Sequence, residues 1–326
     1  MTQLTEDLLV DFEIRESIHG LVDERKLVLA AQGGFLDIAT SIRAALPSWP
    51  DVSIIFRGQT NRAWGIQSTL YRSLEDKLGH QPTEFELEAA ERRVIDAARQ
   101  PRGVPHRTQG QRLGLNLTDG ELLAVLAHHG CPTRFVDVTD DGRVALYFAV
   151  EKDDQLDGRL FFIAMDSSSD VTTNIATPGL WLDLGAKPAL PWGGAAIGVR
   201  NSRGAWSSSV FRAAREHLDP RMSAQGGSFL VGGLNRAYSH RNITYPKRAL
   251  SANELIDLSS LPIGFRRSLK PYRGQPWPAY SWTMKIPAAL KPLVRKELAD
   301  AGIDGESIYP DYDAFLELAE EEARRV

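Results

Sequence analysis

The sequence predicts an α+β fold with a mixed sheet core and surrounding helices. Short apolar runs of strand length alternate with segments of helical period along much of the chain. The 326 residues are 43% hydrophobic and 25% charged, which is typical of a globular protein with a sizeable core. We expect a helical N-terminal extension at residues 1–34 and one main domain at 35–326.

The first elements of the main domain are expected to be a helix, a strand and a second helix. At 34–46, apolar side chains recur on one helical face before Pro47 interrupts the pattern. Residues 53–56 form an apolar run followed by an arginine and a glycine, which suits a buried strand ending in a charged side chain. At 83–99, acidic residues come early and arginines come late, which complements the helix dipole.

The central part of the chain predicts two further helices and two strands. Residues 100–117 are rich in Gly, Pro and Arg and indicate a surface loop. A helix at 122–130 ends in a glycine, which closes helices readily. A strand at 135–138, a buried helix at 144–150 and a strand at 159–165 follow.

The second half of the chain gives weaker patterns. Residues 166–224 are rich in Ser, Gly, Pro and Trp, and we expect a single helix there, near 210–217. A strand at 228–231 follows, and then a helix that starts at Pro292 and runs to Ala301.

Charge and cysteine content narrow the classes of function. The net charge of −4 gives no general reason to expect nucleic-acid binding. Cys131 is the single cysteine, which excludes an internal disulfide and a multi-cysteine zinc site. Without a signal-like start or a long apolar run, the sequence predicts a cytoplasmic protein with no membrane partner.

Arg57 is the first candidate for ligand binding. A guanidinium at a strand end can bind a pyrophosphate or carboxylate bidentately, while Gly58 would let the ligand approach the backbone. The alternative is a structural arginine that pairs with a buried acid such as Asp137.

His128 and His129 end the helix at 122–130, where the helix dipole favours a protonated imidazole and contact with an anion. The alternative is a histidine that only satisfies a carbonyl. We expect no metal there, because adjacent side chains point in different directions and no ligand spacing surrounds them.

Thr133, Arg134, Asp137 and Thr139 concentrate polar groups on one predicted turn and strand. Strand alternation places Asp137 and Thr139 on one face, so they could line a pocket wall. The alternative is a buried polar network that holds the strand to its neighbours.

Gln225 lacks a titratable proton, so it could orient a ribose hydroxyl but could not act as a base. The alternative is a turn glutamine before two glycines.

Four groups of residues, in this order, resemble the FRG-domain family. They are Phe56-Arg57-Gly58-Gln59 with Trp64; residues 122–149 with His128-His129-Gly130, Pro132-Thr133-Arg134, Asp137 and Thr139; Gln225-Gly226-Gly227 with Phe229; and Gly302-Ile303 with Tyr309-Pro310-Asp311. The main domain, 35–326, is therefore identified as an FRG domain. Val138 departs from the family, which often carries Trp there.

The FRG family in turn resembles the ADP-ribosyltransferase fold, which implies that NAD is a substrate. The resemblance implies NAD-binding residues, namely Arg57, Gly58, Gln59, His128, Thr133 and Arg134. It implies catalytic residues, namely Arg57, His129, Asp137, Thr139 and Gln225, with Gln225 standing where such transferases commonly carry Glu. The expected function is an ADP-ribosyltransferase or NAD glycohydrolase with an unknown acceptor, protein or nucleic acid, and we hypothesise a toxin or anti-phage role. The alternative is a non-catalytic ligand-binding or interaction module.

Overall fold

A computed structural model gives the fold of the chain. It describes residues 36, 38–49, 51–99, 117–166, 180–181, 190, 192–193, 206, 209–213, 220–235, 244–245, 248–249, 256–266, 269, 271 and 277–310. The predicted extension at 1–34 and almost all of the predicted loop at 100–117 lie outside the described residues.

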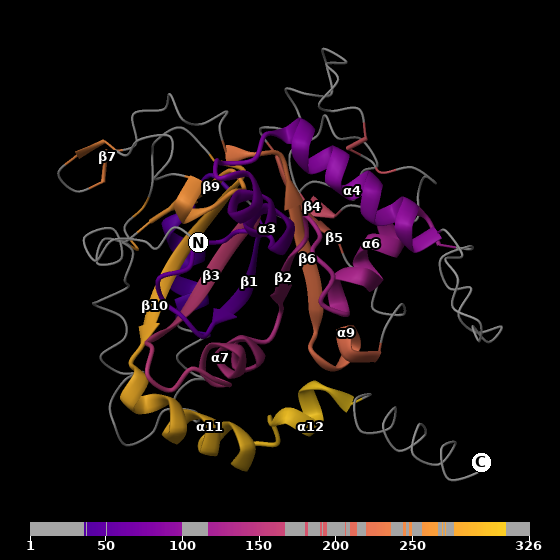
Figure 1. Cartoon of the computed structure of the whole chain (residues 1–326). Coiled ribbons are helices and arrows are strands. Elements are labelled where there is room, and N and C mark those ends of the chain that lie inside the picture. The colour runs from indigo at the N-terminus through magenta and orange to yellow at the C-terminus, as the bar shows by residue number, and fades with distance from the viewer. Residues whose placement is uncertain are drawn as a thin grey trace, which may run out of the picture.

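The core is one sheet with eight strands in the order β4-β5-β6-β2-β1-β3-β10-β9 (Figure 1). The strands are β1 (Val52–Gln59), β2 (Val136–Thr139), β3 (Gly158–Asp166), β4 (Leu180–Trp181), β5 (Val210–Ala213), β6 (Gly227–Gly232), β9 (Ile263–Phe265) and β10 (Ala279–Ile286). Two pairs, β4 with β5 and β9 with β10, are parallel, and the other pairs are antiparallel. The predicted mixed sheet is therefore confirmed. A separate hairpin joins β7 (Thr244–Tyr245) to β8 (Arg248–Ala249).

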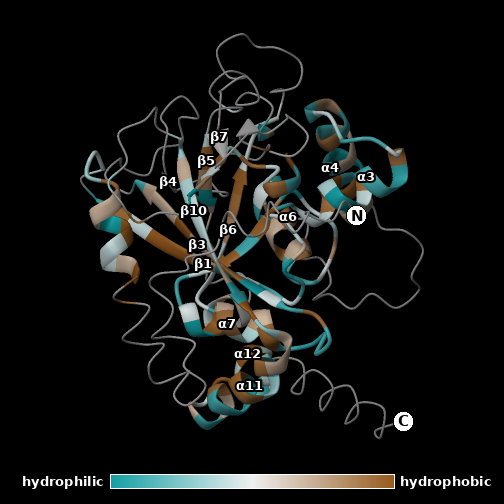
Figure 2. Ribbon diagram, turned by 90° about the vertical axis from the view of Figure 1, so that its left-hand side faces the viewer, coloured by the Kyte–Doolittle hydropathy of each residue, from teal (hydrophilic) through white to brown (hydrophobic). Residues whose placement is uncertain are grey.

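Helices flank the sheet in two groups (Figure 1). They are α3 (Thr69–Leu78), α4 (Glu84–Arg99), α6 (Asp119–His128), α7 (Gly142–Val150), α9 (Pro220–Ala224), η4 (Ala288–Leu290), α11 (Lys291–Asp300) and α12 (Gly305–Ile308). The group of α3, α4 and α6 lies on one side, and the group of α7, α11 and α12 lies on the other, in both views (Figures 1 and 2). None of the helices that the structure describes combines the length and the apolar character needed to cross a bilayer.

Most predicted elements are present with shifted ends, but the segment at 210–217 was predicted wrongly. Its described part is strand β5, which pairs with β6 from Val210 opposite Gly232 to Ala213 opposite Phe229. All four side chains of β5 are buried, so the strand lacks the alternation that distinguishes a strand from a buried helix. Residues 214–217 lie outside the described residues.

Helix α3 was not predicted, although its ends carry ordinary signals. The hydroxyl of Ser68 accepts a hydrogen bond from the Tyr71 amide at 3.1 Å, which caps the first turn. Gly79 closes the helix with a left-handed φ of 71°. Strands β9 and β10 also escaped the sequence analysis.

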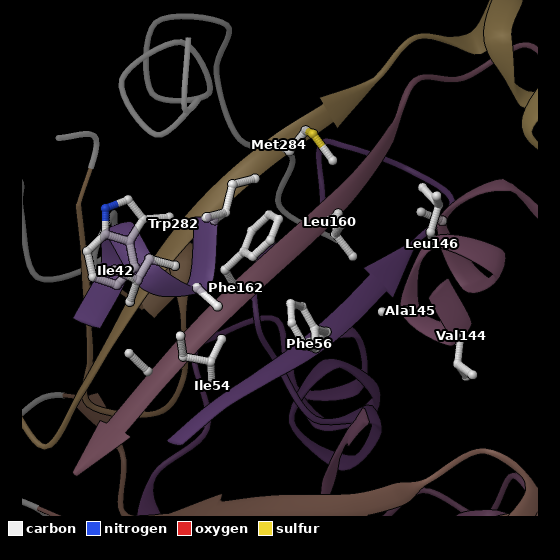
Figure 3. Close-up of a cluster of buried hydrophobic side chains, with 14 of the residues drawn as sticks. Ile42, Ile54, Phe56, Val144, Ala145, Leu146, Leu160, Phe162, Trp282 and Met284 are labelled. Atoms are coloured by element: carbon white, nitrogen blue, oxygen red, sulfur yellow. The ribbon is translucent and has the colours of Figure 1, made fainter. Parts of the chain in front are cut away.

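The largest hydrophobic cluster lies between the sheet and helix α7, and Figure 3 shows part of it. Ile54 and Phe56 of β1 point into this cluster, whereas Ile55 belongs to a second cluster on the opposite face. Strand alternation therefore places Gly58 on the α7 face and Arg57 on the face of Ile55.

Strand β1 pairs very differently with its two neighbours. It pairs with β3 along its whole length, from Val52 opposite Asp166 to Gln59 opposite Arg159. It pairs with β2 at a single position, Phe56 opposite Thr139. The sheet therefore opens between the end of β1 and the beginning of β2, where the backbone groups need other partners.

Candidate functional site

A cavity of about 360 Å³ lies where β1 and β2 separate. Its volume is near the lower end of the roughly 300–1,000 Å³ that small-molecule sites occupy. Six of the predicted site residues line it, namely Arg57, Gly58, His128, Asp137, Thr139 and Gln225. The shared placement of Asp137 and Thr139 agrees with the predicted alternation along the strand.

The Arg57 guanidinium bridges the opening in the sheet. Its Nη1 donates a hydrogen bond to the backbone carbonyl of Asp137 at 2.5 Å, in place of a ladder bond. This is the one hydrogen bond of the Arg57 side chain within the described residues, and Nε has no partner there. Because a guanidinium carries five N–H donors, most of the donor capacity of Arg57 is unused.

The Arg57 charge is only weakly balanced. The nearest Asp137 carboxylate oxygen lies 3.8 Å from Nη1, and the Asp137 side chain is 64% exposed. Burial lowers the pKa of Arg57 to about 10, against the attraction of Asp137, and the neighbouring positive charge of Arg72 lowers it further. The alternative of a structural arginine paired with Asp137 is therefore present in part: the two side chains form an ion pair, but Asp137 is exposed and not buried.

Arg72, on α3, is a cavity residue that sequence reasoning missed. Burial lowers its pKa, and the negative charge of Asp137 raises it. Its Nη1 donates to the Gln67 carbonyl at 2.8 Å, which holds the side chain against the cavity wall. Two guanidiniums thus lie near the exposed Asp137 carboxylate, with Asp76 as a further negative charge near Arg72, and two cations in one cavity wall favour an anionic ligand. The caps of α3 were the signal that could have located Arg72.

Thr139 and Gln225 are adjacent in the cavity lining and are held by hydrogen bonds within the protein. The Thr139 hydroxyl donates to the Gln225 carbonyl at 2.6 Å and accepts from the Asp141 amide at 3.0 Å. The Gln225 side chain donates through Nε2 to the carbonyl of Ile308 at 3.0 Å. Because a carbonyl needs a donor, this contact requires an amide and not a carboxylate, which is a structural reason for Gln at this position.

Gly58 is needed for a different reason than the one predicted. A Cβ at this position would lie 1.7 Å from the Ala145 carbonyl oxygen and 2.7 Å from the Ala149 nitrogen, both in the α7 backbone. Close packing of helix on strand, and not the approach of a ligand, therefore excludes a side chain here.

The two histidines do not act as a pair. His128, in the last turn of α6, lines the cavity, whereas His129 caps the helix, is exposed and lies outside the cavity lining. Their ring planes meet at 87° with centroids 6.2 Å apart, as expected for adjacent helical positions.

Three further predicted ligand-binding residues are buried away from the cavity. Gln59 donates through Nε2 to the Gly65 carbonyl at 3.1 Å, and Thr133 accepts from the Phe135 amide at 3.3 Å. Arg134 forms ion pairs with two glutamates. Their polar groups serve the protein interior, so we leave them out of the proposed site.

The far wall of the cavity comes from residues that the sequence analysis did not select. Phe148, Glu151 and Lys152 come from the end of α7, and Tyr309 follows α12. The Tyr309 hydroxyl donates to Glu151 Oε2 at 3.0 Å. Tyr309 was part of the C-terminal resemblance, but nothing in the sequence linked it to Glu151.

Comparison with known proteins supports the family. Residues 52–158 match the family model described as FRG domain. The matched segment runs from β1 to the beginning of β3 and contains Arg57, Arg72, His128, Asp137 and Glu151, but not Gln225 or Tyr309. No curated protein matches the chain, and no solved structure does either.

Proposed function

We propose that the cavity binds NAD and that the protein is an NAD-dependent ADP-ribosyltransferase or NAD glycohydrolase. The observation that carries the proposal is the pair of guanidiniums, Arg57 and Arg72, which line a 360 Å³ cavity next to the exposed carboxylate of Asp137. A planar fork with unused N–H donors suits the oxygens of a pyrophosphate.

The order of the elements also supports the proposal. Arg57-Gly58 lies on β1, Asp137 and Thr139 lie on β2 directly before α7, and Gln225 directly precedes β6, which is the order that the transferase resemblance requires. Because Gln225 cannot act as a base, such a reaction would depend on positioning and on electrostatic stabilisation of a cationic sugar.

The first experiment measures binding and turnover together. We expect the purified protein to bind NAD and ADP-ribose in calorimetry and to release nicotinamide from NAD. Arg57→Gln should weaken binding of both ligands by roughly 10-fold or more, because a hydrogen bond to a charged group contributes about 1.5–3 kcal/mol. Arg92→Gln is the matched control, since Arg92 is an exposed arginine on α4 outside the cavity.

Two results would contradict this function. The wild-type protein could fail to bind either ligand and to release nicotinamide, or Arg57→Gln could behave like Arg92→Gln. A toxin role is tested with the same variant, because growth arrest on expression should then require Arg57.

The second candidate is a non-catalytic module that binds the same ligand. It is favoured by Thr139 and Gln225, whose hydroxyl and amide nitrogen are already engaged within the protein. Binding of NAD without nicotinamide release or label transfer would support this candidate. Turnover that is lost in Gln225→Ala would exclude it.

A further inference from the structure

The far wall of the cavity differs chemically from the arginine wall. Phe148, Glu151 and Tyr309 come from α7 and the end of α12, whereas Arg57, Arg72 and His128 come from β1, α3 and α6. The two groups of helices lie on opposite sides of the opening in the sheet (Figures 1 and 2). A ligand that fills the cavity would therefore meet two arginines on one side and, on the other, a carboxylate, two aromatic residues and the more exposed ammonium of Lys152.

Glu151 is held in a fixed position within this wall. Its side chain is 19% exposed, and its Oε2 accepts the hydrogen bond from Tyr309. The Tyr309 ring packs edge-on against Phe148, with centroids 6.4 Å apart and planes at 79°. The carboxylate and the two aromatic residues thus line the same cavity, a combination of groups that suits a flat cation.

Hydrogen bonds from a buried lysine also hold the segment that carries Glu151. The ammonium of Lys291, on α11, donates to the carbonyls of Thr60, Lys152 and Asp153 at 2.8, 2.9 and 3.0 Å. The Lys291 side chain is buried, so these bonds fix the chain that follows α7. Because this wall is already ordered, the protein loses little conformational entropy when a ligand binds.

Glu151 and Lys152 both line this end of the cavity, but their exposure to solvent differs. Lys152 Nζ lies 3.4 Å from Glu151 Oε1, but the Lys152 side chain is 66% exposed, so solvent weakens its effect. The pKa of the adjacent Tyr147 is raised by burial and by the negative charges of Glu151 and Asp304, against the opposing charge of Arg295. Two of the three charges that shift the pKa of the Tyr147 hydroxyl are therefore negative.

We propose that Glu151, Tyr309 and Phe148 bind the cationic nicotinamide ring of oxidised NAD and make the cavity selective for NAD⁺ over NADH. The inference rests on the proposed function, and it assigns the orientation of the ligand: the pyrophosphate lies at Arg57 and Arg72, and the ring lies at the far wall. The nicotinamide ring carries a positive charge in NAD⁺ and none in NADH. A carboxylate and aromatic faces stabilise only the charged form in this way.

Calorimetry with three ligands tests the assignment. The wild type should bind NAD⁺ more tightly than NADH. Glu151→Gln should weaken the binding of NAD⁺ by about 5- to 30-fold, as expected for a loss of about one to two kcal/mol. The affinity for ADP-ribose, which lacks the ring, should stay within about twofold of the wild-type value. The amide oxygen of Gln can still accept the Tyr309 bond, so the fold of the wall is retained. Glu306→Gln, at an exposed site on α12, is the matched control.

The outcomes separate this inference from the function on which it depends. Equal affinity of the wild type for NAD⁺ and NADH, or equal weakening of NAD⁺ and ADP-ribose in Glu151→Gln, would overturn the ring assignment and leave NAD binding intact. Failure of the wild type to bind NAD⁺ and ADP-ribose would refute both proposals. Tyr309→Phe, which removes only the hydroxyl, should weaken the binding of NAD⁺ by a smaller factor than Glu151→Gln does. The binding of ADP-ribose should again be unchanged.

Discussion

Arg57, which is partly buried, and Arg134, which is fully buried, both lie next to β2, yet their surroundings are opposite. Arg134 Nε donates to both carboxylate oxygens of Glu91 at 3.0 Å, Nη2 donates to Glu91 at 2.9 Å, and Nη1 pairs with Glu84. Its guanidinium lies 6.0 and 5.6 Å from the ring centroids of Trp192 and Trp206. Arg57 has one hydrogen bond to a carbonyl and one exposed carboxylate nearby.

The two pKa shifts express this difference. Burial lowers the pKa of Arg134, but the attraction of Glu84 and Glu91 outweighs it, and the pKa rises above the ordinary value. At Arg57 burial prevails, and the pKa falls to about 10. A buried charge with all its partners inside the protein stabilises the fold, whereas one that lacks partners retains the capacity to bind a ligand.

The largest expected effect is on stability at the Arg134 network. Arg134→Met should lower the free energy of unfolding by about 3–5 kcal/mol, because it removes the cationic partner of the buried Glu91 carboxylate and of the partly buried Glu84 carboxylate. Arg57→Gln should change it by no more than about 1 kcal/mol, since a single hydrogen bond is lost at a cavity wall. Urea denaturation of both variants measures the contrast. Equal losses of unfolding free energy in the two variants would show that Arg57 stabilises the fold as much as Arg134 does, which would contradict the comparison.

Gly58→Ala tests how closely α7 packs on β1 at the position next to Arg57. We expect a loss of about 3 kcal/mol, at the upper end of ordinary overpacking costs, because the added methyl group meets the α7 backbone. Thermal unfolding reports this loss, and Gly227→Ala is a milder control whose nearest contact would be 3.3 Å. A Gly58→Ala variant as stable as wild type would show that α7 packs more loosely than the distances indicate.

A smaller loss than at Arg134 or Gly58 is expected at Gln225. Gln225→Glu should reduce the free energy of unfolding by about 1–2 kcal/mol, because the Ile308 carbonyl loses its donor and faces a carboxylate. The loss should shrink at low pH, where a protonated Glu can donate again. If Gln225→Glu and the wild type had the same free energy of unfolding at every pH, the contact between Gln225 and the Ile308 carbonyl of α12 would contribute nothing to stability.

The match to the FRG-domain model over residues 52–158 and most of the secondary structure were accessible from the sequence because they depend on local patterns. The helices α4 and α7 and the strands β1, β2, β3 and β6 follow from residue spacing and caps over a few turns. The joint placement of Asp137 and Thr139 on one cavity wall follows from strand alternation alone.

Long-range contacts decided the rest, because the partner of a polar side chain depends on which distant segments meet. Arg134 finds Glu91 43 residues away, and Glu151 finds Tyr309 158 residues away. Spacing along the chain gives no information on such pairs. Local sequence patterns place Arg57 near the end of a strand, in a segment that matches the FRG-domain model. The packing of α3, α7 and α12 around the opened sheet decides that this guanidinium faces a cavity while that of Arg134 does not, because such contacts join segments far apart in the chain.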